Sequence, residues 1–171
     1  MSAFTNDPSE WQRLDWSLLQ NSPIALYHST DVLEEDIVWF KQDGYVVRSL
    51  NSERWESATS LLPALGTTLR FPEHFGGNLD AFNDCVSDLD VPQDGGFVLV
   101  LREFERAAAS FPTEAHAILD ILASNSRRFL LTGQRLIVLV HSNDPDIQFQ
   151  PVGAMPVLWN PREWLDAKRV P

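Results

Sequence analysis

A cluster of carboxylates lies in one stretch of the sequence that contains no lysine or arginine. Between Phe71 and Leu101 the acidic residues are Glu73, Asp80, Asp84, Asp88, Asp90 and Asp94. Asp80, Asp84 and Asp88 are four residues apart, so on a helix they form one acidic ridge. Like charges at this spacing repel by roughly 0.2–0.5 kcal/mol per pair. The ridge is therefore either a solvated helix face or a surface that binds cations.

Apolar residues between these carboxylates predict the helix that carries them. One face repeats at helical spacing and should pack on the body of the domain: Leu79, Phe82, Val86 and Leu89. Asn78, preceded by two glycines, supplies an N-cap. The helix dipole stabilises the charge of Asp80 near the helix start but not that of Asp88 near the end. A contribution to helix stability therefore explains the presence of Asp88 less well than that of Asp80.

The same segment resembles the signature of a known family. Residues 71–85 read Phe-Pro-Glu-His-Phe-Gly-Gly-Asn-Leu-Asp-Ala-Phe-Asn-Asp-Cys. This run is similar, almost position by position, to the Pro-Glu-aromatic-aromatic-Gly-x-Asn-Leu-Asp-Ala-x-x-Asp-Cys pattern of the barstar family, intracellular inhibitors of barnase-like secreted ribonucleases. We expect the similarity to extend over 44–141, which leaves an N-terminal strand and helix and a C-terminal tail as additions.

The resemblance implies a stoichiometric inhibitor that blocks a basic ribonuclease or nuclease toxin as a monomer in a 1:1 complex, without cofactor or metal. Asp84 would occupy the position of the scissile phosphate, and Asp80 would pair with a flanking arginine. A preformed carboxylate would thus mimic a phosphate oxyanion at its cationic site. His74 would replace an aromatic residue of the binding loop. The expected partner-binding residues are His74, Gly76, Asn78, Leu79, Asp80, Asn83, Asp84 and Asp88.

Three positions depart from the family's pattern. An aromatic residue expected near Asn83 is absent, and Leu89 replaces another. The family's acidic residue on a later helix falls near Ser124 or Asn125, which leaves Asp120 as a poor substitute. These departures leave the identity of the cognate nuclease open.

Four runs that are apolar on both faces predict buried strands. They cover 24–27, 45–47, 97–101 and 136–140. Stripes of helical spacing at 33–40, 55–65 and 118–122 separate them, in addition to the acidic helix. The alternation predicts an α/β fold with a small parallel sheet of about four strands, flanking helices and right-handed crossovers.

Length and composition indicate one globular domain over 1–171. Its core would be 44–141, with an N-terminal extension at 1–43 that adds a strand and a helix, and a tail at 142–171. Both extensions contain an Asx-Pro-x-Glu-Trp sequence, at 7–11 and 160–164. Each such sequence supplies an N-cap, a first-turn proline and a glutamate able to complete a capping box, so each predicts a short helix.

The formal net charge of -11 at pH 7 disfavours two classes of ligand. It repels phosphate backbones and anionic membrane surfaces, so we expect no direct nucleic-acid or membrane binding and favour a basic protein partner. No apolar run approaches the roughly 20 residues of a membrane helix. Cys85 is the only cysteine, and the N-terminus lacks the pattern of a secretory signal, so we expect a cytoplasmic location.

The sequence gives little support for an enzyme. Its histidines have no metal-site spacing: His28, His74, His116 and His141. Cys85 lies beside the buried stripe among carboxylates, which should raise its pKa. Two alternatives remain beside the inhibitor: a barstar-like module for a basic partner that is not a nuclease, and a hydrolase that uses Asp84 and a histidine.

Overall fold

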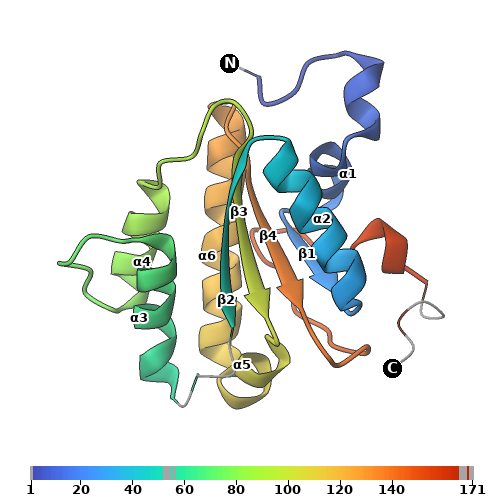
Figure 1. The fold of residues 1–171 in the computed structure, drawn as a ribbon. Coiled ribbons are helices and arrows are strands. Elements are labelled where there is room, and N and C mark those ends of the chain that lie inside the picture. The colour runs from blue at the N-terminus through green and yellow to red at the C-terminus, as the bar shows by residue number, and fades with distance from the viewer. Residues whose placement is uncertain (1, 52–54, 56, 166–168, 170–171) are drawn as a thin grey trace.

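The chain forms a layered α/β fold in the computed structural model, which describes residues 2–51, 55, 57–165 and 169 (Figure 1). Within these residues five parallel strands form one sheet in the spatial order β2-β3-β4-β1-β5. The strands are β1 (Ile24–Tyr27), β2 (Tyr45–Asn51), β3 (Gly96–Arg102), β4 (Leu136–His141) and β5 (Leu158–Trp159). The α/β class and the parallel sheet are confirmed, and the strand number is one higher than expected. With only two residues, β5 is too short for its apolar side chains to predict a strand.

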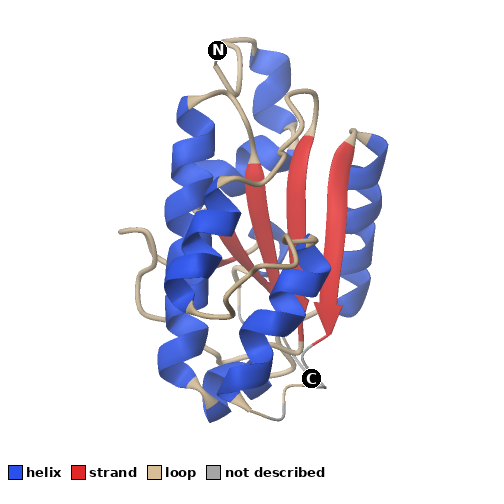
Figure 2. Ribbon diagram, turned by 90° about the vertical axis from the view of Figure 1, so that its left-hand side faces the viewer, coloured by secondary structure: helices blue, strands red, loops and turns tan. Residues whose placement is uncertain are grey.

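Helices cover both faces of the sheet, as Figure 2 shows from the side of α3 and α4. The α-helices are α1 (Leu14–Asn21), α2 (Thr30–Gln42), α3 (Ala58–Leu69), α4 (Leu79–Ser87), α5 (Glu105–Ser110) and α6 (Pro112–Leu131). The side chains of α1 and α2 pack on one face, and those of α3, α4 and α6 pack on the other. Because both faces are covered, the strands are apolar on both sides.

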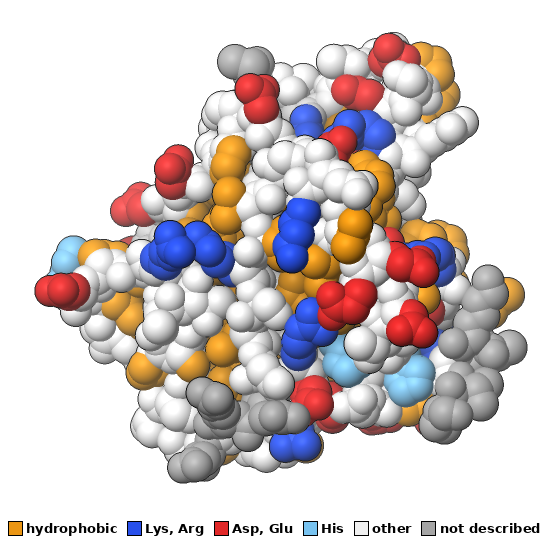
Figure 3. Space-filling view, in the orientation of Figure 1, with side chains coloured by type: hydrophobic (Ala, Val, Ile, Leu, Met, Phe, Trp, Pro, Cys, Tyr) orange, Lys and Arg blue, Asp and Glu red, His pale blue; other side chains and the backbone are white. Residues whose placement is uncertain are grey.

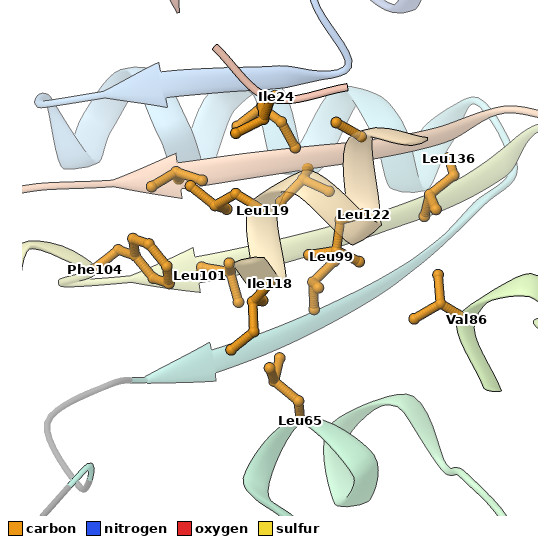
Figure 4. Close-up of a cluster of buried hydrophobic side chains, with 14 of the residues drawn as sticks. Ile24, Leu65, Val86, Leu99, Leu101, Phe104, Ile118, Leu119, Leu122 and Leu136 are labelled. Atoms are coloured by element: carbon orange, nitrogen blue, oxygen red, sulfur yellow. The ribbon is translucent and has the colours of Figure 1, made fainter. Parts of the chain in front are cut away.

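The larger hydrophobic core lies between the sheet and the α3, α4 and α6 layer (Figure 4). Leu99 of β3, Leu65 of α3 and Val86 of α4 meet there and are fully buried. Alternate residues of each strand point to the opposite face, so Val98 and its neighbours pack under α2. This packing fixes the position of α4 relative to the edge strand β2.

A buried ionic network joins the N-terminal segment to the sheet. Asp15 on α1 is 0% exposed and pairs with Arg13 at 2.9 Å and Arg135 at 3.3 Å. It also accepts a hydrogen bond from the Tyr45 hydroxyl at the start of β2. Burial and the nearby Asp15 raise the pKa of Tyr45 well above its usual range, so its hydroxyl stays protonated and donates.

The C-terminal segment is held by a second buried carboxylate. Glu163 accepts the backbone N–H groups of Ser29 at 2.8 Å and His28 at 3.2 Å, at the N-terminus of α2. Its turn is the 3-10 helix η3 (Pro161–Glu163), which Asn160 caps. Both Asx-Pro sequences thus start short helices as expected, the other being η1 (Pro8–Gln12). The capping-box role expected of Glu163 is wrong, because its carboxylate caps α2 and not its own turn.

Candidate protein-binding site

Helix α4 presents the acidic segment on the surface of the molecule. The Asn78 side chain accepts the N–H of Ala81 at 2.8 Å and caps the helix. Gly77 before it has φ +66°, a conformation that favours glycine. Phe82 and Val86 are fully buried, so the predicted apolar stripe anchors the helix to the core. The opposite face is left for Asp80 and its neighbours.

The three carboxylates of the ridge are exposed. Asp80 and Asp84 lie on α4, and Asp88 is its C-cap, one residue beyond the last helical turn. Within the described part of the chain none of the three forms an ion pair. Their charges are therefore available to a partner.

The loop before α4 is fixed by aromatic packing. The rings of Phe71 and Phe75 meet edge to face with centroids 5.1 Å apart. Phe75 also covers Gly66 of α3 so closely that a Cβ there would lie 2.7 Å from the ring. His74, between these anchors, is exposed. The loop thus presents His74 from a rigid base.

A groove of about 620 Å³ lies between this loop, α4 and the edge strand β2. Its floor is apolar and includes Val46, Leu69, Phe71, Phe75, Leu89 and Phe97. Acidic residues line it from the α4 side, among them Asp84 and Asp88, and two basic residues line it as well, Arg48 and Arg70. Figure 3 shows acidic side chains and a histidine at the left edge of the molecule, with basic side chains just inside them.

Half of the predicted binding residues line this groove. They are His74, Gly76, Asp84 and Asp88. These four come from the loop, from α4 and from its C-cap, so the structure brings together two carboxylates grouped by helical spacing and two loop residues that the family resemblance implied. Their role in binding stays a prediction.

The other predicted residues lie elsewhere on the same helix. Asn78 is the N-cap, and Leu79 is half-buried against the core. Asp80 is exposed in the first turn, outside the groove lining. Asn83, where the family pattern has an aromatic residue, faces α6 and accepts a hydrogen bond from Asn125 at 2.9 Å. Asn125 is one of the two positions near which the family's later acidic residue was expected, so this contact joins the two regions that depart from the family pattern.

Arg48 and Arg70 were not predicted as site residues. Arg48 interrupts the apolar run of β2, so the sequence-based strand stopped at residue 47. Val46, Arg48 and Leu50 alternate along β2, and Val46 and Leu50 pack on the α3 side. A period-two pattern would therefore have placed Arg48 on that face. No local signal places Arg70 beside it.

Among the residues that the structure describes, the cysteine and the histidines form no second catalytic or metal site. Cys85 is half-buried, and desolvation with the nearby Asp84 and Asp88 raises the pKa of its thiol, which makes the thiolate scarce. Among the histidines His74 lines the groove, whereas His28 and His141 lie at the carboxyl ends of β1 and β4. No group of three or more His, Cys, Asp or Glu side chains in the described residues could hold a metal.

A family model described as Barstar (barnase inhibitor) matches residues 31–141, well over half of the chain. The chain belongs to the barstar family. The match begins within α2 and covers the groove, α4 and the three strands β2, β3 and β4. Barstar proteins are inhibitors rather than enzymes, which agrees with the expectation from the sequence. A search of curated proteins found no match, and no helix in the described part of the chain is long and apolar enough to cross a membrane.

Proposed function

We propose that this protein inhibits a small basic ribonuclease by inserting α4 and the loop before it into the enzyme's phosphate-binding cleft. One observation carries the proposal: Asp80 and Asp84 are exposed, and form no ion pair with any described residue, on a helix that is anchored to the core beside a loop held by aromatic packing. The family membership supports the same reading.

The physical basis is phosphate mimicry by preorganised carboxylates. A ribonuclease cleft holds arginine, lysine and histidine side chains that bind a phosphodiester. Asp84 would take the place of the scissile phosphate, and Asp80 would pair with a cation at its side. Charge-assisted hydrogen bonds of this kind are about twice as strong as neutral ones. Because α4 is held by Phe82 and Val86, the carboxylates lose little conformational freedom on binding.

Titration of an active ribonuclease tests the proposal. Barnase and other small basic ribonucleases are assayed for RNA cleavage at increasing concentrations of the purified protein. We expect cleavage by at least one of them to fall linearly to zero at one equivalent, as in a 1:1 complex. Full cleavage by every enzyme at a large excess of the protein would contradict the proposal.

The same surface could bind a basic protein that is not a nuclease. Asn83 favours this second candidate, since an amide paired with Asn125 replaces the family's aromatic contact. A partner isolated by affinity capture on the protein and found inactive toward RNA would support it.

We also propose that inhibition takes place in the cytoplasm. The single Cys85 is unpaired, and a free thiol suits a reducing compartment. Its raised pKa also keeps it in the less reactive thiol form.

A further inference from the structure

The groove beside α4 carries charges of both signs. Arg48 and Arg70 line it together with Asp84 and Asp88. Neither arginine forms an ion pair or a side-chain hydrogen bond within the residues that the structure describes. In a protein of net charge -11, two unpaired arginines on the proposed binding face are unexpected, because a basic partner would repel them.

Arg70 also occupies a position where its side chain has a conformational cost. It ends α3 with φ 60° and ψ 44°, in the left-handed region. The N–H of Phe71 bonds to the carbonyl of Gly66, which is the closing hydrogen bond of a Schellman motif. This position usually holds glycine or asparagine, since other residues are strained there. An arginine needed only for solubility could lie anywhere on α3 without that strain.

We propose that Arg48 and Arg70 receive a carboxylate of the partner protein. The inference rests on the proposed function and specifies the partner further. Its contact surface would be bipolar, with cations opposite Asp80 and Asp84 and an acidic side chain, flanked by apolar residues, in the groove. The groove's apolar floor suits such a segment. RNA suits the groove less well than a single carboxylate, because its repeated phosphates exceed the two arginines in number and would also meet Asp84 and Asp88.

This bipolar pattern would act as a specificity determinant. Ribonucleases share a cationic cleft, so carboxylates on α4 alone would distinguish them poorly. A ribonuclease with a lysine or a hydrophobic residue opposite Arg70 would bury an uncompensated charge on binding, which disfavours the complex.

A pair of charge reversals tests the inference. Arg70→Glu and Lys41→Glu each change the formal net charge from -11 to -13, by loss of one positive and gain of one negative charge. Lys41 is exposed on α2, which covers the opposite face of the sheet. The inhibition constant is measured against a ribonuclease that the wild-type protein inhibits. We expect Arg70→Glu to weaken inhibition at least about 10-fold and Lys41→Glu to leave it equal or slightly stronger.

A further variant separates binding from folding. Arg70→Gly relieves the left-handed strain, so its thermal midpoint should be equal to or above that of the wild type while inhibition weakens. In addition, acidic surface residues of the ribonuclease are replaced by lysine one at a time. We expect one of these ribonuclease variants to be inhibited less well by the wild-type protein and better by Arg70→Glu.

The outcomes distinguish this inference from the proposed function. If Arg70→Glu strengthens inhibition as Lys41→Glu does, while Asp84→Ala abolishes it, the groove inference is wrong and the proposed function stands. If Asp84→Ala inhibits as well as the wild type, the proposed site is wrong. A wild-type protein that inhibits no ribonuclease overturns both.

Discussion

Asp15 is the residue whose burial most constrains the stability of the N-terminal segment. Its carboxylate is fully buried between Arg13, Arg135 and Tyr45. Removal of the Asp15 carboxylate leaves the largely buried Arg135 without its ion-pair partner and the Tyr45 hydroxyl without its acceptor, whereas Arg13 keeps Asp43. Breaking a buried ion pair costs up to about 3–5 kcal/mol. Asp15→Ala should therefore lower the free energy of unfolding by that amount in urea denaturation.

Asp43 provides the matched control for this substitution. It also pairs with Arg13, but its side chain is 32% exposed. Asp43→Ala should cost only about 0–1 kcal/mol. Equal losses for the two variants would show that the buried network contributes no more than a surface ion pair.

His141 makes stability depend on pH. Its ring lies at the end of β4, where Nδ1 accepts the backbone N–H of Glu103, and burial lowers its pKa below 6.5. The unfolded chain therefore takes up a proton first as the pH falls. The contribution of neutral His141 to the free energy of unfolding is therefore complete above pH 6.5, and it is lost as the pH falls through the folded-state pKa.

His141→Asn should reduce this dependence, since its amide oxygen can still accept the hydrogen bond. The test compares urea denaturation of the two proteins from pH 8 to pH 5. We expect the stability of the wild type, relative to the variant, to decrease below about pH 6.5. A difference that stays constant over this range would contradict the assigned role.

At the scale of elements, the N-terminal strand and helix should be part of the folding unit. β1 lies between β4 and β5, and α2 covers one face of the sheet. Deletion of 1–43 would expose that face and the edge of β4. We expect the truncated protein to melt at a much lower temperature or not to fold. A single domain over 1–171 stays a prediction, and an unchanged melting temperature of the truncated protein would contradict it.

The sequence predicted the elements that have a local pattern of their own, such as an apolar run or an N-cap followed by an apolar stripe. β1 was predicted to the residue because its four side chains are all apolar and buried. α4 followed from its N-cap and apolar stripe. β5 was not predicted, because Leu158 and Trp159 are in the sheet through pairing with β1 and not through a pattern of their own.

The site was predictable in its acidic half, whereas in its basic half alternation along β2 could give only the face on which Arg48 lies. Asp80 and Asp84 are close in sequence, so helical geometry alone joins them. Arg48 reaches the groove through the packing of β2 against α3 and α4, and that packing depends on the whole core. Asn83 and Asn125 are likewise distant in sequence, so their contact could not be read from either segment.

At the scale of the molecule, the net charge of -11 should act on association before contact is made. Charge complementarity steers encounter over distances comparable to the Debye length, roughly 10 Å at 0.1 M salt. Stopped-flow association with a basic ribonuclease should therefore slow by about 10-fold or more when ionic strength rises from about 0.05 to 0.5 M. An on-rate independent of salt would mean that the acidic surface does not steer the encounter.

The central claim is that the acidic surface of α4 fills the cleft of a ribonuclease. Asp84 and Asp88 are both exposed and unpaired groove residues, but Asp84 lies within α4 and Asp88 is its C-cap, one turn further from the loop. The resemblance of residues 71–85 to the barstar signature implies the phosphate-mimicking role for Asp84 and not for Asp88, so we expect Asp88 to stay hydrated at the rim of the complex.

Inhibition and stability are measured for Asp84→Ala and Asp88→Ala in parallel. Asp84→Ala should weaken inhibition by about 2–5 kcal/mol, because the enzyme's cations would be left buried and unpaired. Asp88→Ala should cost about 0–1 kcal/mol. Each variant should be at least as stable as the wild type, since repulsion along α4 is relieved. Equal losses of inhibition at the two positions, or a marked loss of stability in Asp84→Ala, would contradict the claim.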